Sequence, residues 1–69
     1  MPQDSHQRAA EFHEMAAHAH RAAATRHGKE DHLTAHELSR QALEHSRKAL
    51  EASQTAFEQS AAAAKQQPK

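Results

Sequence analysis

The sequence predicts an all-α protein, an antiparallel helical hairpin that dimerises into a four-helix bundle. Composition is the first reason: 17 of the 69 residues are Ala, while Val, Ile, Tyr, Trp and Cys are absent, so the residues that sheets favour are missing. The second reason is a seven-residue repeat of small and apolar residues, the period of a left-handed coiled coil. The third is the only glycine, Gly28, which separates two long stretches without Gly or Pro. We therefore expect a single domain over residues 1–69.

The first helix is expected over about residues 5–27. Asp4 or Ser5 can cap its start, because Asp4 is followed three residues later by Gln7, in capping-box spacing. Gly28 stands where a helix end favours a residue in the left-handed conformation. The turn is therefore expected over about residues 28–31.

The second helix is expected over about residues 31–66. Asp31 can cap its first turn, and the next helix breaker is Pro68. A turn of a few residues makes the two helices antiparallel neighbours. The alternative is one continuous helix through Gly28, which would cost only about 1 kcal/mol for the glycine.

The second helix repeats the pattern Ala-x-Glu-x-Ser four times, beginning at Ala35, Ala42, Ala49 and Ala56. The residue after each of these alanines is His36, Leu43, Leu50 or Phe57. Helical geometry places the Ala, Ser and Leu/Phe rows on one side and the Glu row on the other. The sequence therefore predicts a seam with a solvated acidic face opposite to it.

The first helix carries two matching rows, Ala9, Ala16 and Ala23, and His6, His13, His20 and His27. If the turn is centred between Lys29 and Glu30, the numbers of facing residues add up to about 59. Large residues then meet small ones in the pairs Leu50 with Ala9, Leu43 with Ala16 and His36 with Ala23. Imidazoles meet hydroxyls in the pairs His6 with Ser53, His13 with Ser46 and His20 with Ser39, and His27 meets His32. This double match is the main argument for a hairpin.

Apart from Met1, the chain has seven large apolar side chains, which is few for a domain of this size, and small domains often need a metal or self-association. The end of the second helix, residues 58–67, has no partner in the expected hairpin. A symmetric homodimer would supply one and would bury Met15, Leu38 and Phe57. We therefore expect self-association.

The run from His27 to His32, HGKEDH, lies between two helices rich in Ala and His. This arrangement resembles a group of small, uncharacterised bacterial two-helix proteins. The resemblance implies a helical hairpin and brings no activity with it.

Eight histidines make metal binding the most specific chemical hypothesis. Only His32 and His36 are spaced so that two rings share a helix face. With His27 from across the turn and Asp31 or Glu30 as an oxygen donor, they would form a Zn, Ni or Cu site. Glu14 with His18 is a weaker second candidate. The alternative is that the histidines are polar residues of the surface and the seam.

The histidine row also suggests a response to pH. Neutral imidazoles buried against serines would fix the register, as a polar seam residue does in a coiled coil. Protonation would then be opposed by burial, and we expect the assembly to loosen between about pH 6.5 and 5.

Other function classes find little support. The serines of the second helix lie mid-helix without an orienting acid or a glycine loop, so no enzyme is expected. Nine basic residues balance nine acidic ones, which argues against nucleic acid as a partner, and no run approaches a membrane span. We expect a cytoplasmic, non-enzymatic interaction or structural module. The alternative is a cytoplasmic protein that binds or buffers a transition metal through His27, His32 and His36.

Overall fold

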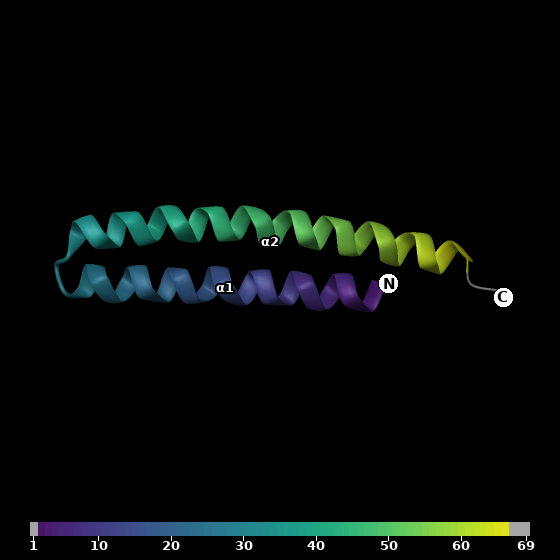
Figure 1. The fold of residues 1–69 in the computed structure, drawn as a ribbon, viewed down its shortest axis with the longest axis horizontal. Coiled ribbons are helices and arrows are strands. Elements are labelled where there is room, and N and C mark those ends of the chain that lie inside the picture. Colours follow the sequence, from purple (N-terminus) through teal and green to yellow (C-terminus); the bar gives the residue numbers. More distant parts are fainter. Residues whose placement is uncertain (1, 67–69) are drawn as a thin grey trace.

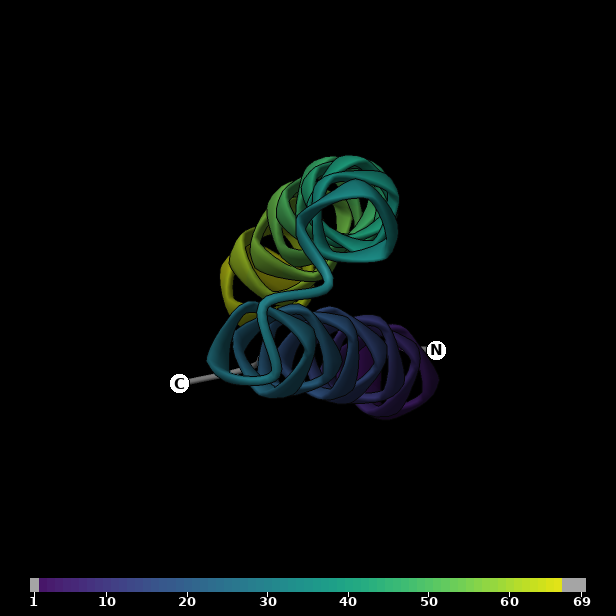
Figure 2. The same ribbon diagram turned by 90° about the vertical axis from the view of Figure 1, so that its left-hand side faces the viewer.

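The computed structural model is an all-helical hairpin of two antiparallel helices, α1 (Pro2–Gly28) and α2 (His32–Gln66), as Figure 1 shows. The structure describes residues 2–66; Pro68, the expected helix breaker, lies outside them. The two helices are in contact along their shared length, which confirms the hairpin and excludes the continuous helix. Viewed end-on in Figure 2, they are inclined to each other, as in a coiled coil.

The start of α1 differs from the expected one. The helix begins at Pro2, a residue type whose fixed φ suits the first helical turn. Asp4 therefore lies inside the first turn, where its negative charge is favourable at the positive end of the helix dipole, and neither Asp4 nor Ser5 is the cap.

The turn assigns the left-handed position to Glu30 and not to the glycine. Gly28 is the last residue of α1 and has no positive φ, whereas Glu30 has φ 61°. The Asp31 N–H donates to the Arg26 carbonyl (2.9 Å) and the Glu30 N–H donates to the His27 carbonyl (3.0 Å). These are the two bonds of a Schellman motif with Glu30 in the position that glycine usually takes. The expectation for Gly28 was therefore wrong by two residues.

Asp31 caps α2 as expected. Its Oδ1 accepts a hydrogen bond from the Thr34 N–H (3.4 Å), and its carbonyl accepts one from the Ala35 N–H (3.0 Å). The first contact satisfies a backbone donor that the first helical turn leaves without a partner, and the second is the first hydrogen bond of the helix itself.

Alanine forms the core of the hairpin. Ala35, Ala42, Ala49 and Ala56 of α2 are fully buried, and they pack against Ala9, Ala16, Ala19 and Ala23 of α1, which are 5–8% exposed. Methyl groups on both sides let the helices approach closely, and a leucine in the seam would force them apart. The expected packing of large against small residues is wrong, because Leu43 is 49% and Leu50 58% exposed.

The register is shifted by one seven-residue repeat relative to the expected one. His6, His13 and His20 contact Ser60, Ser53 and Ser46, so that facing numbers add up to 66 and not 59. Helical side chains lean toward the N-terminus of their own helix. In this hairpin the histidines therefore lean away from the turn and the serines lean toward it, and each histidine meets the serine one repeat farther along α2.

The turn end keeps the expected pair. His27 contacts His32, while Ser39, which the shifted register would pair with His27, donates to its own helix at the Ala35 carbonyl (2.8 Å). At the other end, α1 reaches Ser60, so the part of α2 without a partner is shorter than expected. It comprises residues 61–66 and extends beyond α1 in Figure 1.

Candidate functional site

A ladder of histidine–serine contacts runs along one side of the alanine seam. The His13 Nε2 lies 2.7 Å from the Ser53 Oγ, and the distances are 2.6 Å for His6 with Ser60 and 3.4 Å for His20 with Ser46. The serines are half-buried but the histidines are exposed. The expected burial of the imidazoles in the seam is therefore absent from the hairpin itself.

Two further rows extend this ladder on either side, and we call the four rows together the ladder face. From α1 it takes the row of His6, His13, His20 and His27 and the row of Gln3, Ala10, Ala17 and Ala24. From α2 it takes the row of His32, Ser39, Ser46, Ser53 and Ser60 and the row of His36, Leu43, Leu50, Phe57 and Ala64. Members of neighbouring rows are three or four residues apart and therefore adjacent on the helix surface.

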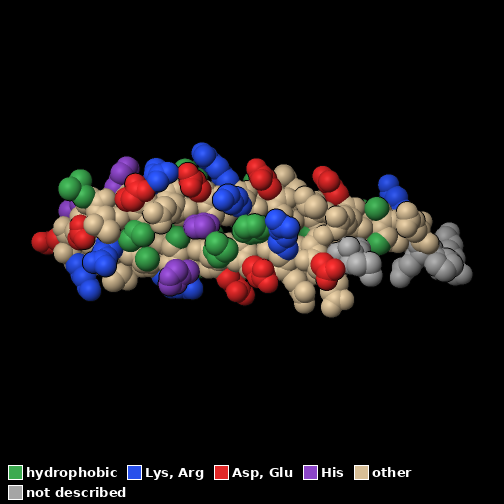
Figure 3. Space-filling model, in the orientation of Figure 1, with side chains coloured by type: hydrophobic (Ala, Val, Ile, Leu, Met, Phe, Trp, Pro, Cys, Tyr) green, Lys and Arg blue, Asp and Glu red, His purple; other side chains and the backbone are tan. Residues whose placement is uncertain are grey.

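The ladder face contains no Asp, Glu, Lys or Arg, although 26% of the chain is charged. Its large apolar residues stay open to solvent, with Leu43 49%, Leu50 58% and Phe57 71% exposed. The charged residues all belong to the other rows, and Figure 3 shows basic and acidic side chains interleaved over both helices. Among the described residues, three of the five exposed large apolar side chains therefore lie on the charge-free side, whereas Met15 and Leu33 lie in other rows.

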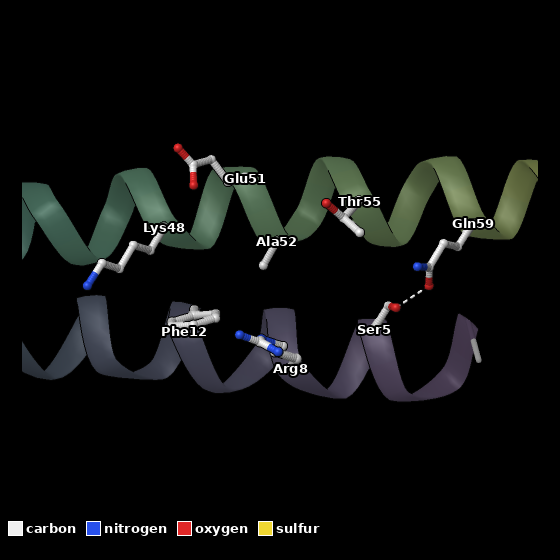
Figure 4. Close-up of a pocket in the computed structure, with 8 residues that line it drawn as sticks. All are labelled: Ser5, Arg8, Phe12, Lys48, Glu51, Ala52, Thr55 and Gln59. Atoms are coloured by element: carbon white, nitrogen blue, oxygen red, sulfur yellow. Dashed lines mark hydrogen bonds between the residues drawn. The ribbon is translucent and has the colours of Figure 1, made fainter.

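The groove on the opposite side of the seam is polar and charged. Figure 4 shows Arg8, Lys48 and Glu51 among its lining residues, and the Ser5 hydroxyl donates to the Gln59 amide oxygen across it. The Arg8 guanidinium lies 5.6 Å from the centre of the Phe12 ring, within the range of a cation–π contact. On this side of the seam, the Arg8 side chain therefore covers part of the Phe12 ring.

Nearer the turn, the same groove is lined by Met15, Leu38 and His45. Met15 and Leu38, which were expected in one dimer interface with Phe57, therefore lie on the side of the seam opposite to Phe57. The His45 Nδ1 is buried without a hydrogen-bond partner. Glu14 and His18, the second metal candidate from the sequence, also line this part. No group of three metal-binding side chains forms here or elsewhere within residues 2–66.

At the turn, two of the predicted metal ligands do come together. The Nδ1 atoms of His27 and His32 are 3.2 Å apart, and their ring centres are 5.5 Å apart with the planes tilted by 41°. Both residues belong to the ladder face, one on each helix. The two rings share a hydrogen bond between these nitrogens, and the contact of His27 with His32 that the sequence predicted is therefore present.

The other two predicted ligands are not part of this pair. Asp31 caps α2, and its second carboxylate oxygen lies 3.9 Å from the Arg26 guanidinium. His36 lies one turn farther along α2, in the neighbouring row of the ladder face. The expected four-ligand set in a single chain is therefore reduced to two nitrogens.

The ladder also places hydroxyls within reach of imidazoles, the first requirement of a nucleophile–base pair. A nucleophile also needs an oriented base and donors for a developing oxyanion. Ser53 lies mid-helix, where the backbone N–H groups are already used in the helix. We therefore interpret the histidine–serine contacts as structural.

The acidic row of α2 carries the best-defined ion pairs. Arg40 donates to Glu37 (2.5 Å) and to Glu44 (3.0 Å), and all three side chains are about half exposed. The hydrogen bond from Arg40, together with its positive charge, lowers the pKa of the Glu37 carboxyl. Glu37 in turn raises the pKa of Arg40. Arg40 belongs to the row that borders the ladder face, Glu37 and Glu44 lie one row farther away, and the cluster stabilises the surface of α2.

Comparisons with protein-family models, curated proteins and solved structures find no match. The resemblance to bacterial two-helix proteins therefore stays a prediction. Within residues 2–66, neither helix is long and apolar enough to cross a membrane.

Proposed function

We propose that this chain is a non-catalytic structural or interaction module that associates with itself through the ladder face. Two hairpins packed face to face form a four-helix bundle, in which the rows of Leu43 and Ala17 meet those of the second copy. The observation that supports this proposal best is the absence of charge from the one side that exposes Leu43, Leu50 and Phe57. Charged residues are depleted from the centres of protein interfaces, where large apolar residues are common.

The shape of the hairpin suits a dimer. It measures 58 by 13 Å between Cα atoms, so a second copy packed face to face would meet it along both helices. A second copy is the occupant that supplies an equally long and equally charge-free surface.

In this dimer the histidines of the ladder face would make association depend on pH. Six of the eight histidines lie on the ladder face, at positions 6, 13, 20, 27, 32 and 36. When neutral they leave the face without charge, and packing of a second copy withdraws them from water. Protonation would add up to six positive charges to each copy, next to Arg21, Arg40 and Arg47, with Glu14 the only acid in the bordering rows. The dimer is therefore favoured at neutral pH and opposed at acid pH.

The test compares two substitutions at residues of equal exposure on opposite sides. Leu43 on the ladder face is 49% exposed and Met15 in the opposite groove is 46% exposed. Leu43→Glu places a charge in the proposed interface and is expected to weaken dimerisation at least about tenfold, whereas Met15→Glu leaves the dimer intact. Sedimentation equilibrium measures both masses, and circular dichroism checks that each variant stays helical. An unchanged mass for Leu43→Glu would exclude the ladder face.

A further inference from the structure

We propose that the His27–His32 pair binds a zinc ion that is shared between two copies of the chain. The proposal rests on the self-association above for the second half of the site. It replaces the four ligands that the sequence suggested within one chain by two imidazoles from each of two chains.

The distance between the two nitrogens is the first argument. Zinc binds imidazole nitrogen at about 2.0–2.1 Å and prefers a tetrahedron, in which two ligand atoms lie about 3.3–3.4 Å apart. The His27 and His32 Nδ1 atoms lie 3.2 Å apart and share a hydrogen bond, so a zinc ion would take the place of the bridging proton at a spacing close to this one.

The composition of the site is the second argument. Within residues 2–66 no third metal-binding side chain joins the pair, so one chain offers half of a tetrahedron. The Asp31 carboxylate contacts the Thr34 N–H and the Arg26 guanidinium instead of the rings. Two more ligands must come from water or from a second chain, and a structural zinc site is closed by four protein ligands.

The position of the pair is the third argument. His27 and His32 both lie on the ladder face at its turn end, one on each helix. If the two-fold axis of the dimer runs parallel to the helices, both turns lie at the same end and the two pairs face each other. In this orientation α1 of each copy faces α2 of the other, so that the row of Leu43 packs on the row of Ala17. With the turns at opposite ends, each helix would face its own counterpart, and the row of Leu43 would meet another leucine row.

The test is a zinc titration of the tag-free protein, followed by native mass spectrometry and calorimetry. The expected result is one zinc ion for two chains. The double variant His27→Ala, His32→Ala is expected to lose this complex, and the single variants His27→Gln and His32→Gln to weaken it. The matched control is His18→Ala, His45→Ala, which removes two imidazoles from the opposite groove and should bind zinc as the wild type does. His36→Ala should also bind normally, since His36 is not part of the pair.

The outcomes separate this inference from the proposed function. A chain that dimerises without zinc but shows no zinc binding, or binds it equally in the double variant, overturns the shared site and leaves the self-association. One zinc ion bound to a single chain also overturns it. A chain that is monomeric without metal and forms a two-chain complex only with zinc supports the site and contradicts dimerisation through the ladder face alone.

Discussion

Ala42 and Leu43 are neighbours in α2, yet the small residue is fully buried and the large one is 49% exposed. Ala42 lies in the seam, where methyl groups on both helices allow a close approach. Leu43 lies beyond the serine row, on a face that the hairpin alone does not cover. The contrast shows that one chain completes its contacts through small residues and leaves its large ones for another surface.

The largest effect on stability is expected from a larger residue in the alanine seam. Ala42→Leu inserts three carbon atoms between helices that are held together by methyl contacts, and such overpacking typically costs 1–3 kcal/mol, so we expect a loss of about 2 kcal/mol or more. Urea denaturation followed by circular dichroism measures it. Ala63→Leu, in the part of α2 beyond α1, is the control and should have little effect. Equal stability of the two variants would mean that the seam is not the core.

At the turn, the smallest residue stands at a position that has room for a side chain. Gly28 lies in a helix with ordinary φ, and a Cβ added there meets nothing within 4 Å. Gly28→Ala is therefore expected to raise the free energy of unfolding by about 1 kcal/mol, the difference in helix propensity. Thermal or urea denaturation measures the change. Destabilisation would show that Gly28, and not Glu30, adopts the left-handed conformation in solution.

A smaller effect on stability is expected from substitutions in the histidine–serine ladder, which lies between the alanine seam and the row of Leu43. A hydrogen bond between groups that remain open to water contributes about 0.5 kcal/mol, so a double-mutant cycle of His13→Ala and Ser53→Ala should give a coupling of that order. The cycle of His13→Ala with Ser46→Ala tests the register that was expected from the sequence and should give none. Coupling in the second cycle but not in the first would show that the register expected from the sequence is the correct one.

The smallest effect is expected on the acidic row, farthest from the seam. Because Arg40 lowers the pKa of Glu37, the carboxylate adds stability above its ordinary pKa, and this contribution is lost as the pH falls through the lowered value. Both groups are solvent-exposed, so the gain is small. NMR titration of the Glu37 carboxyl should show its pKa return toward the ordinary value in Arg40→Gln. An unchanged titration would mean that the pair does not persist in solution.

Much of the fold could be predicted from the sequence, because it depends on composition, on the repeat and on the cap at Asp31. The rows that meet were also identified correctly, since a shift by a whole repeat preserves them. The partners within the rows were not, because residue numbers alone omit the lean of side chains along each helix. The core was mistaken because large residues were expected inside, whereas the seam of Ala42 and its repeats excludes them. Of the candidate metal site, the contact of His27 with His32 follows from the turn. Asp31 was expected both as the cap and as a metal ligand, and its contacts with the Thr34 N–H and the Arg26 guanidinium are those of the cap.

The most direct test of self-association through the ladder face is the mass of the wild-type protein without tag or metal, measured by sedimentation equilibrium at pH 7.5 and at pH 5. At pH 7.5 we expect a dimer, twice the chain mass of 7.6 kDa. At pH 5 we expect single helical chains, because protonated histidines charge the ladder face. A single chain at pH 7.5, at every concentration up to the millimolar range, or a dimer equally stable at both pH values, would contradict this proposal.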